Sequence, residues 1–255
     1  MIFITGDTHG DFKRFSSSRF SAQSEMTKND VVIICGDFGG IWNDSPEERY
    51  WLDWLNDKPF TTIYVDGNHE NFDRYYSDEF ETVDLYNGKA QKIRDSIFHL
   101  LRGEVFQIQG KRIFAFGGAS SHDIKDGIID PSNYPDSKAF NRELQMMSFL
   151  GKQFRVKGMS WWEQEIPSEV EMQHGIDMLE KYNNEVDYII THCLPQEIAS
   201  IFSMGLYNSD KLTMYFNKIL HDGLKYLKWY CGHYHVDRCI MGKFNILYEK
   251  IVRLV

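Results

Sequence analysis

Residues 61–70 read T-T-I-Y-V-D-G-N-H-E. The run Thr61–Val65 is apolar and rich in β-branched and aromatic side chains, which predicts a buried strand. Asn68, His69 and Glu70 follow it directly. Such residues are either turn residues or a metal ligand and a proton donor presented at a strand end. The rest of the sequence has to distinguish these two interpretations.

Two earlier runs have the same character. Ile2–Thr5 and Val31–Cys35 also read as buried strands, and the three runs begin about 30 residues apart. That spacing suits parallel strands joined by crossover helices. We predict these helices at Asp11–Arg19 and Pro46–Asp57, the second starting with a proline suited to a first helical turn.

The middle of the chain changes to hairpin-like strands. Phe98–Leu101, Val105–Ile108 and Arg112–Phe116 predict antiparallel pairing, with a tight turn at 109–111. The further predicted elements are helices at 138–154 and 168–182, a strand at Asp187–Ile190, a helix at 210–222, a strand at Tyr226–Tyr230 and hairpin-like strands from 236 to 255. We therefore expect one α/β catalytic domain over 1–255, with a loop and helical insertion at roughly 117–182.

Composition narrows the class of protein. The chain is 42% hydrophobic and 25% charged, with a net charge of -9 and a pI of about 5.5. These values argue against a surface for duplex nucleic acid, but not against a small phosphorylated substrate, since bound cations can reverse the local field. No membrane segment or signal peptide is evident, and the four cysteines form no paired framework. We therefore expect a cytoplasmic protein, whose oligomeric state the sequence does not indicate.

Polar side chains with ligand chemistry follow five of the predicted strands. In chain order they are Asp7 and His9, Asp37, Asn68 and His69, His192, and His233 and His235. Strand ends in an open α/β sheet converge on one ligand site, because neighbouring strands are only about 4.8 Å apart. A glycine precedes four of these groups and would let the strand end turn sharply. The four glycines are Gly6, Gly36, Gly67 and Gly232.

The chemistry of this set predicts a metal centre. It offers too many ligands for one tetrahedral zinc ion. Mixed imidazole, carboxylate and amide ligands suit two divalent ions such as Mn, Fe or Zn, and we expect Mn to support activity in vitro. A carboxylate that bridges two such ions is typical of phosphoryl transfer sites.

The motifs G-D-T-H-G, G-D, G-N-H-E, T-H and G-H-Y-H, in this order, resemble those of the calcineurin-like metallophosphoesterases. The resemblance extends from Asp7 to His235 and so covers nearly the whole chain. It implies an α/β, four-layer β-sandwich of two mixed sheets flanked by α-helices. G-G-A-S-S-H-D and W-W-E-Q-E-I-P-S are similar to bacterial and phage-associated members of unassigned substrate.

The resemblance also implies roles for single residues. Asp7, His9 and His235 would bind the first metal. Asn68, His192 and His233 would bind the second, and Asp37 would bridge the two. A hydroxide between the metals would attack phosphorus, while His69 would act as general acid or stabilise developing charge. Asn68, His69 and His122 are the candidates for contact with the substrate, although His122 also suits a solvated loop.

One motif departs from the phosphoprotein phosphatases of the family, which usually continue the bridging aspartate with V-D-R-G. Here Asp37 is followed by F-G-G-I-W, so Gly40 and Ile41 stand where an aspartate and a phosphate-binding arginine are expected. This argues against a protein Ser/Thr phosphatase. Asp66 becomes the candidate for orienting His69. Arg14, Arg74 and Arg142 are candidates for contact with phosphate.

The sequence thus predicts a binuclear metal-dependent phosphoesterase that hydrolyses a phosphomonoester or phosphodiester. Two alternatives stay open. One is a nuclease of the same fold that acts on single-stranded nucleic acid or nucleotides. The other is a metal-binding scaffold with little or no turnover.

Overall fold

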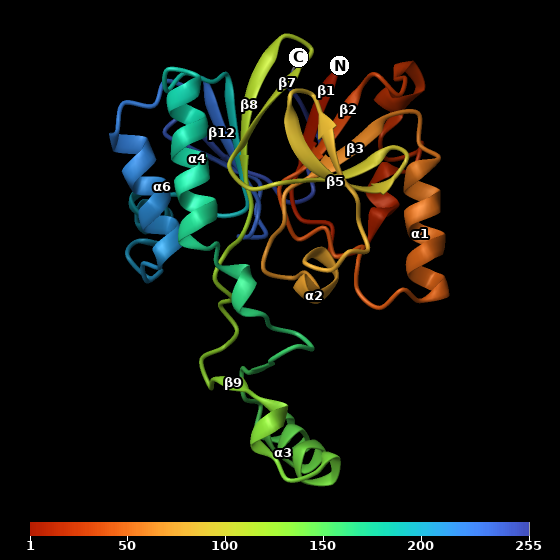
Figure 1. The fold of residues 1–255 in the computed structure, drawn as a ribbon, viewed down its shortest axis with the longest axis vertical. Helices are drawn as coiled ribbons and strands as arrows, with labels where there is room; N and C mark the ends of the chain where they lie inside the picture. The colour runs from red at the N-terminus through yellow and green to blue at the C-terminus, as the bar shows by residue number, and fades with distance from the viewer. Residues whose placement is uncertain (255) are drawn as a thin grey trace.

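The fold is a sandwich of two mixed β-sheets with helices on both outer faces (Figure 1). The computed structural model describes residues 1–254. The predicted α/β sandwich of two mixed, helix-flanked sheets is confirmed. Within the described residues, no helix has both the length and the apolar character needed to cross a membrane.

The first sheet has seven strands in the order β15-β1-β2-β3-β6-β5-β4. They are β1 (Ile2–Thr5), β2 (Val31–Ile34), β3 (Thr61–Tyr64), β4 (Thr82–Leu85), β5 (Gly88–Arg94), β6 (Ile97–Leu100) and β15 (Val252–Arg253). β1, β2, β3 and β6 run parallel, β15 and β5 pair antiparallel with β1 and β6, and β4 pairs antiparallel with β5. The three parallel strands predicted first therefore form the centre of this sheet.

The second sheet has six strands in the order β13-β14-β12-β11-β8-β7. They are β7 (Glu104–Ile108), β8 (Lys111–Phe116), β11 (Tyr188–Thr191), β12 (Lys228–Cys231), β13 (Arg238–Ile240) and β14 (Phe244–Ile246). The predicted hairpin through 109–111 joins β7 and β8. β6 and β7 do not pair, because the chain passes from one sheet to the other between them.

Helices cover the two outer faces. The α-helices are α1 (Pro46–Asn56), α2 (Phe72–Tyr75), α3 (Ser137–Phe149), α4 (Glu169–Lys181), α5 (Gln196–Ser203) and α6 (Lys211–His221). The 3₁₀ helices are η1 (Phe12–Phe15), η2 (Ser21–Glu25), η3 (Pro131–Asn133) and η4 (Glu163–Glu165). α4 and α6 lie against the six-stranded sheet, and α1 lies on the far side of the seven-stranded sheet.

The alternation of strand side chains builds three apolar layers. Ile2 and Ile4 point between the two sheets, where they join Ile33 and Ile190. Phe3 points to the opposite face of its sheet and packs in a cluster with the phenylalanines of η1 and with Phe20, which directly precedes η2. A third cluster lies between the six-stranded sheet and its helices. Because successive residues of a strand face opposite sides, both faces of each central strand are buried.

An insertion leaves the sandwich after β8. Figure 1 shows β9 (Ile128–Ile129) and α3 extending away from the two sheets. β10 (Arg155–Val156) pairs in parallel with β9 and brings the chain back. No residue of α3 is buried. The limits of the catalytic domain stay a prediction.

Candidate metal centre

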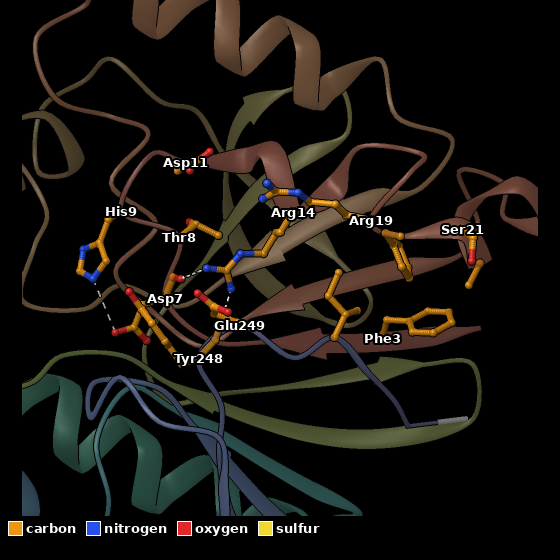
Figure 2. Close-up of a pocket in the computed structure, with 13 residues that line it drawn as sticks. Phe3, Asp7, Thr8, His9, Asp11, Arg14, Arg19, Ser21, Tyr248 and Glu249 are labelled. Atoms are coloured by element: carbon orange, nitrogen blue, oxygen red, sulfur yellow. Dashed lines mark hydrogen bonds and ion pairs between the residues drawn. The ribbon is translucent and has the colours of Figure 1, made fainter.

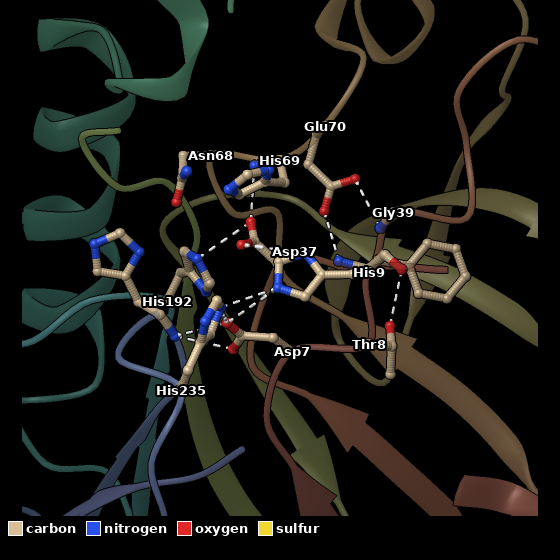
Figure 3. A network of polar contacts seen from close by, with 12 residues as sticks. Asp7, Thr8, His9, Asp37, Gly39, Asn68, His69, Glu70, His192 and His235 are labelled. Atoms are coloured by element: carbon tan, nitrogen blue, oxygen red, sulfur yellow. Dashed lines mark hydrogen bonds and ion pairs between the residues drawn. The ribbon is translucent and has the colours of Figure 1, made fainter. Parts of the chain in front are cut away.

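The predicted ligands meet at the edge of the sandwich where the parallel strands end (Figure 3). Residues after β1, β2 and β3 come from one sheet, and residues after β11 and β12 come from the other. Their short mutual distances show that all seven side chains border one small volume. The seven are Asp7, His9, Asp37, Asn68, His192, His233 and His235.

Four of them form a compact group that suits a cation. One ligand atom from each of Asp7, His9, Asp37 and His235 lies within 4.8 Å of the others. Nε2 of His9 and Nε2 of His235 face each other at 3.0 Å. Nε2 of His235 is also 3.2 Å from Oδ2 of Asp7. Nitrogen and carboxylate oxygen ligands at this spacing suit a divalent transition metal.

The remaining three ligands, Asn68, His192 and His233, are buried. Nδ1 of His192 is 2.7 Å from the carbonyl oxygen of Cys35, so the ring donates there and turns Nε2 inward. Among the described residues, Oδ1 of Asn68 is buried without a hydrogen-bond partner, and Nε2 of His192 faces the Asp37 carboxylate at 3.2 Å. Buried polar atoms are nearly always paired, so an unpartnered amide oxygen beside an inward-facing imidazole nitrogen fits a second cation.

Asp37 lies between the two groups. Its Oδ1 is 3.2 Å from Nε2 of His192, and its Oδ2 is 3.8 Å from Nδ1 of His9. The backbone N–H of His69 donates to Oδ1 at 2.8 Å. One carboxylate oxygen thus faces each group of ligands, which is the placement that a bridging ligand requires.

The electrostatics of this pair also suit a cation. Burial alone would raise the pKa of Asp37, but the imidazoles of His192, His69 and His9 hold that pKa well below its usual range. Burial lowers the pKa of His192, but the Asp37 carboxylate outweighs it and raises the pKa of the ring above its usual value. The proton on His192 therefore compensates a buried negative charge, a role that a bound metal ion would take over.

Four of the ligands have unusual backbone conformations. The φ angles are +46° at His9, +45° at Asp37, +70° at His233 and +50° at His235. Residues with a Cβ rarely adopt this left-handed region, and it concentrates at functional sites where the surroundings enforce it. The strand ends therefore turn at the ligands themselves.

This finding corrects the expectation about the glycines before the ligands. Of the four, only Gly36 has a positive φ, at +90°. Gly67 and Gly232 are needed for space instead. A Cβ on Gly67 would lie 2.0 Å from Oδ1 of Asp37, and a Cβ on Gly232 would lie 2.0 Å from Oδ1 of Asp7. These glycines let the backbone approach the ligand carboxylates closely.

His69 lies at the edge of the centre, with its ring 5.0 Å from that of His9. Its Nε2 is 2.9 Å from Nη2 of Arg155, a buried arginine on β10. Burial, together with the charge of Arg155, lowers the pKa of His69 to about 4. The ring is therefore neutral at pH 7 and keeps one N–H to donate, so of its two expected roles, charge stabilisation suits this state better than proton transfer. Both roles stay predictions.

Asp66 does not orient His69, contrary to the sequence-based expectation. Its carboxylate binds the guanidinium of Arg102, with Nε of Arg102 at 3.0 Å, and lies 3.2 Å from Nε2 of His99. These contacts fix the loop after β3.

Glu70 lies just before α2, which begins at Phe72. The buried carboxylate of Glu70 accepts the backbone N–H groups of Phe38 at 2.8 Å and Gly39 at 3.3 Å. It therefore holds the loop that carries Asp37.

The insertion supports Asn68. Nδ2 of Asn68 is 3.4 Å from the hydroxyl oxygen of Ser121, which orients the amide so that Oδ1 faces inward. Glu165 in η4 accepts both the N–H of Ser121, at 2.9 Å, and its hydroxyl, at 2.6 Å. Burial raises the pKa of Glu165 to about 7 despite these hydrogen bonds.

A cavity of about 810 Å³ opens beside the first group of ligands (Figure 2). Asp7 and His9 line one part of it, and Arg14, Arg19 and Tyr248 line the rest. Arg14 is not free for phosphate, because it donates to the carbonyl oxygens of Asp7, at 2.6 Å, and Tyr248.

The two other arginines considered from the sequence are also not positioned to bind phosphate. Arg74 is paired with Glu48 and Glu79, and Arg142 is exposed on α3. His122 lies close to the second group of ligands: its ring centroid is 4.2 Å from that of His233 and 5.0 Å from that of Tyr207. A role for His122 in substrate binding stays a prediction.

Comparison with known proteins agrees with this geometry. Residues 1–237 match the family calcineurin-like phosphoesterase, and the chain belongs to that family. Lariat debranching enzyme A of Xenopus laevis is 26% identical over 149 residues. That match covers 52% of this chain and 26% of the Xenopus protein, so it concerns only about a quarter of that protein's length.

The structure places three residues beside the site that the sequence analysis did not expect there. They are Arg155, Ser121 and Glu165. Ser121 and Glu165 lie within quoted motifs; the sequence indicates no role for Ser121 and favours a solvated acidic face for Glu165, which is wrong because Glu165 is buried. Arg155 lies 86 positions from His69 and carries no motif. Arginine is rarely buried, so its burial would mark Arg155 as a candidate functional residue. That burial can be recognised only once the fold is known.

Proposed function

We propose that this protein is a metal-dependent phosphoester hydrolase that acts on a small phosphorylated substrate with two divalent ions, of which Mn²⁺ supports activity in vitro. The observation that carries the proposal is the placement of Asp37 between two groups of ligand atoms, one oxygen toward each. When bound, such ions would supply an activated water and neutralise charge on the phosphoryl oxygens.

The proposed roles of the individual residues are the following. Asp7, His9 and His235 would hold one ion, Asn68, His192 and His233 the other, and Asp37 would contact both. His69 would donate an N–H to the leaving oxygen or protonate it. His122, beside His233, would contact the part of the substrate beyond the phosphate. We retain a cytoplasmic location and the absence of duplex nucleic acid and membrane partners as predictions from the sequence.

The test is hydrolysis of an aryl phosphate monoester and an aryl phosphate diester by the Mn²⁺-loaded protein. We expect His69→Ala to lower kcat by about 10²-fold or more. His221→Ala is the matched control, because His221 is exposed, pairs with Glu197 and lies outside the site. A wild-type protein that binds two ions but hydrolyses neither ester would favour the scaffold alternative.

A nuclease acting on single strands is the second candidate, and the cavity beside Asp7 and His9 favours it. At about 810 Å³ it exceeds the space that a lone phosphate group occupies and falls within the range of ligand pockets. The Xenopus relative is named for debranching lariats. A single-stranded oligonucleotide assayed beside the two aryl esters separates the candidates by their kcat/KM values.

A further inference from the structure

We propose that Arg155, which the insertion brings to the metal centre, binds a non-bridging oxygen of the substrate phosphoryl group. The inference rests on the proposed function, because it assigns a substrate contact within that site. Within residues 1–254, it concerns the one guanidinium that lies directly against His69.

The position of Arg155 is fixed from several sides. Its backbone belongs to β10, in register with Ile128 of β9. Nε and Nη2 bind the carboxylate of Asp123 at 2.7 and 2.8 Å. Nη1 donates to the carbonyl oxygen of Ser160 at 2.9 Å. The guanidinium is therefore held in one orientation before any substrate arrives, which reduces the entropic cost of binding an anion.

The other N–H groups of the Arg155 guanidinium face His69 or have no acceptor within the described residues. A guanidinium has five N–H groups. Asp123 takes two, Ser160 takes one, and one N–H of Nη2 faces the ring of His69. Within the described residues this leaves one N–H of Nη1 without an acceptor. A fixed cation with donors available suits a phosphoryl oxygen, which a guanidinium binds more strongly than a neutral ring nitrogen.

The ring of His69 is a poor final partner for this guanidinium. Nη2 lies 2.9 Å from Nε2 and 3.2 Å from Nδ1 of the same ring. An atom this close to both ring nitrogens cannot lie along both lone pairs, so the contact is not a well-directed hydrogen bond. The backbone N–H of His69 donates to Asp37, the carboxylate that faces both ligand groups. Arg155 therefore contacts the side chain of a residue that itself binds this carboxylate.

A purely structural role is the competing explanation. Arg155 and Asp123 would then simply tie the insertion to itself. Asp123 separates the two explanations, because its carboxylate pairs with Arg155 while its own side chain is 52% exposed. Asp123→Asn breaks the same ion pair but keeps the guanidinium, whereas Arg155→Ala removes both.

The experiment compares wild type, Arg155→Ala, Arg155→Lys, Asp123→Asn and Arg142→Ala as full-length, Mn²⁺-loaded proteins. Affinity for inorganic phosphate is measured by calorimetry, which needs no turnover. The kinetics of aryl phosphate hydrolysis and the metal content are measured in parallel. Arg142→Ala is the matched control, since Arg142 is an exposed arginine of the same insertion.

We expect Arg155→Ala to weaken phosphate binding by about tenfold or more and to lower kcat/KM by about 10²-fold, with the metal content unchanged. Asp123→Asn should lose less than about fivefold and Arg142→Ala less than about twofold in either quantity. Arg155→Lys should lose about tenfold in kcat/KM, because an ammonium keeps the charge but not the planar donors.

Equal losses in Arg155→Ala and Asp123→Asn would overturn the inference in favour of a structural tie. So would a phosphate affinity of Arg155→Ala within twofold of wild type. If Arg155→Ala does not fold, Arg155→Lys decides, and wild-type kinetics in that variant would overturn the inference. A wild type without hydrolysis would refute the proposed function alone, and the dependence of phosphate binding on Arg155 would still decide the inference.

Discussion

The two halves of the proposed metal centre have similar candidate ligands in different surroundings. The side chains of His9 and His235 are 31% and 50% exposed. On the other side, His192 is fully buried and His233 nearly so. The first half borders an open cavity, whereas the second lies under the base of the insertion, where Ser121 and Glu165 support Asn68.

This difference separates two tasks that a binuclear centre has to combine. The two histidines of the first half are accessible to solvent, whereas its carboxylate, Asp7, is buried and accepts the backbone N–H of His233 at 2.9 Å. The buried half is part of the core, so its ligands also carry packing and hydrogen bonds of the fold. We therefore expect loss of a histidine in the first half to affect metal binding alone, and a lesion in the buried half to affect metal binding and stability together.

The largest effect is expected where the halves meet. Asp37→Asn weakens the only carboxylate among the described residues that faces both groups, so both ions should be lost. Hydrolysis should fall by at least about 10²–10³-fold. Elemental mass spectrometry of the purified protein checks the ion count. Asp84→Asn, at an exposed carboxylate on β4, should keep both ions. Retention of one ion in Asp37→Asn would contradict the bridging role.

A paired substitution tests the contrast directly. His235→Ala should lose one ion and leave the free energy of unfolding of the metal-free protein nearly unchanged, since the ring is half exposed. His192→Ala should also lose one ion, but in addition should destabilise the protein by about 1–3 kcal/mol, because the buried carbonyl of Cys35 loses its partner. Urea unfolding with and without a chelator measures both. Equal destabilisation by the two substitutions would remove the distinction between the halves.

The support of the buried half should depend on pH. The pKa of Glu165 is raised from an ordinary value of 4.5 to about 7, so the folded state holds this proton more tightly than the unfolded state. The corresponding stability is fully present below pH 4.5 and is lost as the pH rises through 7. Glu165→Gln has no proton to lose.

The stability advantage of wild type over Glu165→Gln should therefore shrink by on the order of 3 kcal/mol between pH 4.5 and pH 8. Chemical unfolding across this range measures it. The adjacent exposed residue provides the control, since Glu163→Gln should show no such trend. A difference between wild type and Glu165→Gln that stays constant with pH would show that burial does not raise this pKa.

The smallest effect is expected at the hydroxyl that orients Asn68. Ser121→Ala should weaken binding of the second ion by about tenfold, because residues that orient a ligand typically contribute 10–100-fold and this contact is long, at 3.4 Å. The first ion should bind as before. Competition with a fluorescent chelator resolves the two affinities. Ser120→Ala is the neighbouring control, and an equal effect there would exclude a specific role for Ser121.

The central strands and the convergence of the candidate ligands were predictable from the sequence. Ile2–Thr5 was predicted at its observed limits, and the other two central strands were predicted to within a residue, because a continuous apolar run is a strong signal for a strand buried on both faces. The ligands follow these strands at once, so their convergence required only the general geometry of a parallel sheet.

Elements without a local pattern were missed. Asp11–Arg19 was predicted as a crossover helix, but the chain forms only the short 3₁₀ helix η1 there, and η2 follows beyond Arg19. Phe12 and Phe15 are three residues apart, a spacing that suits one turn of either helix type, so the sequence did not distinguish them. The hairpin of β4 and β5 was overlooked because its two-residue turn is Tyr86-Asn87, with φ of +49° and +68°, and tyrosine is not a usual residue for the first of these positions.

Contacts between distant residues were out of reach. The carboxylate of Glu70 finds its donors only because Asp37 adopts a left-handed conformation that frees the backbone N–H groups of the next two residues. Arg155 meets His69 only after the insertion has folded back through β10. No periodicity or residue spacing in the sequence predicts either of these contacts.

The left-handed conformations at His9, Asp37, His233 and His235 bear on how the protein could evolve. Each costs of order 1 kcal/mol for a residue with a Cβ, and glycine or asparagine would relieve much of that cost. A search for more stable variants that does not also select for metal would therefore be drawn to the ligand positions themselves. Thermostability and a metal centre compete for the same residues here, so a laboratory lineage selected only for heat resistance should lose its ligands early.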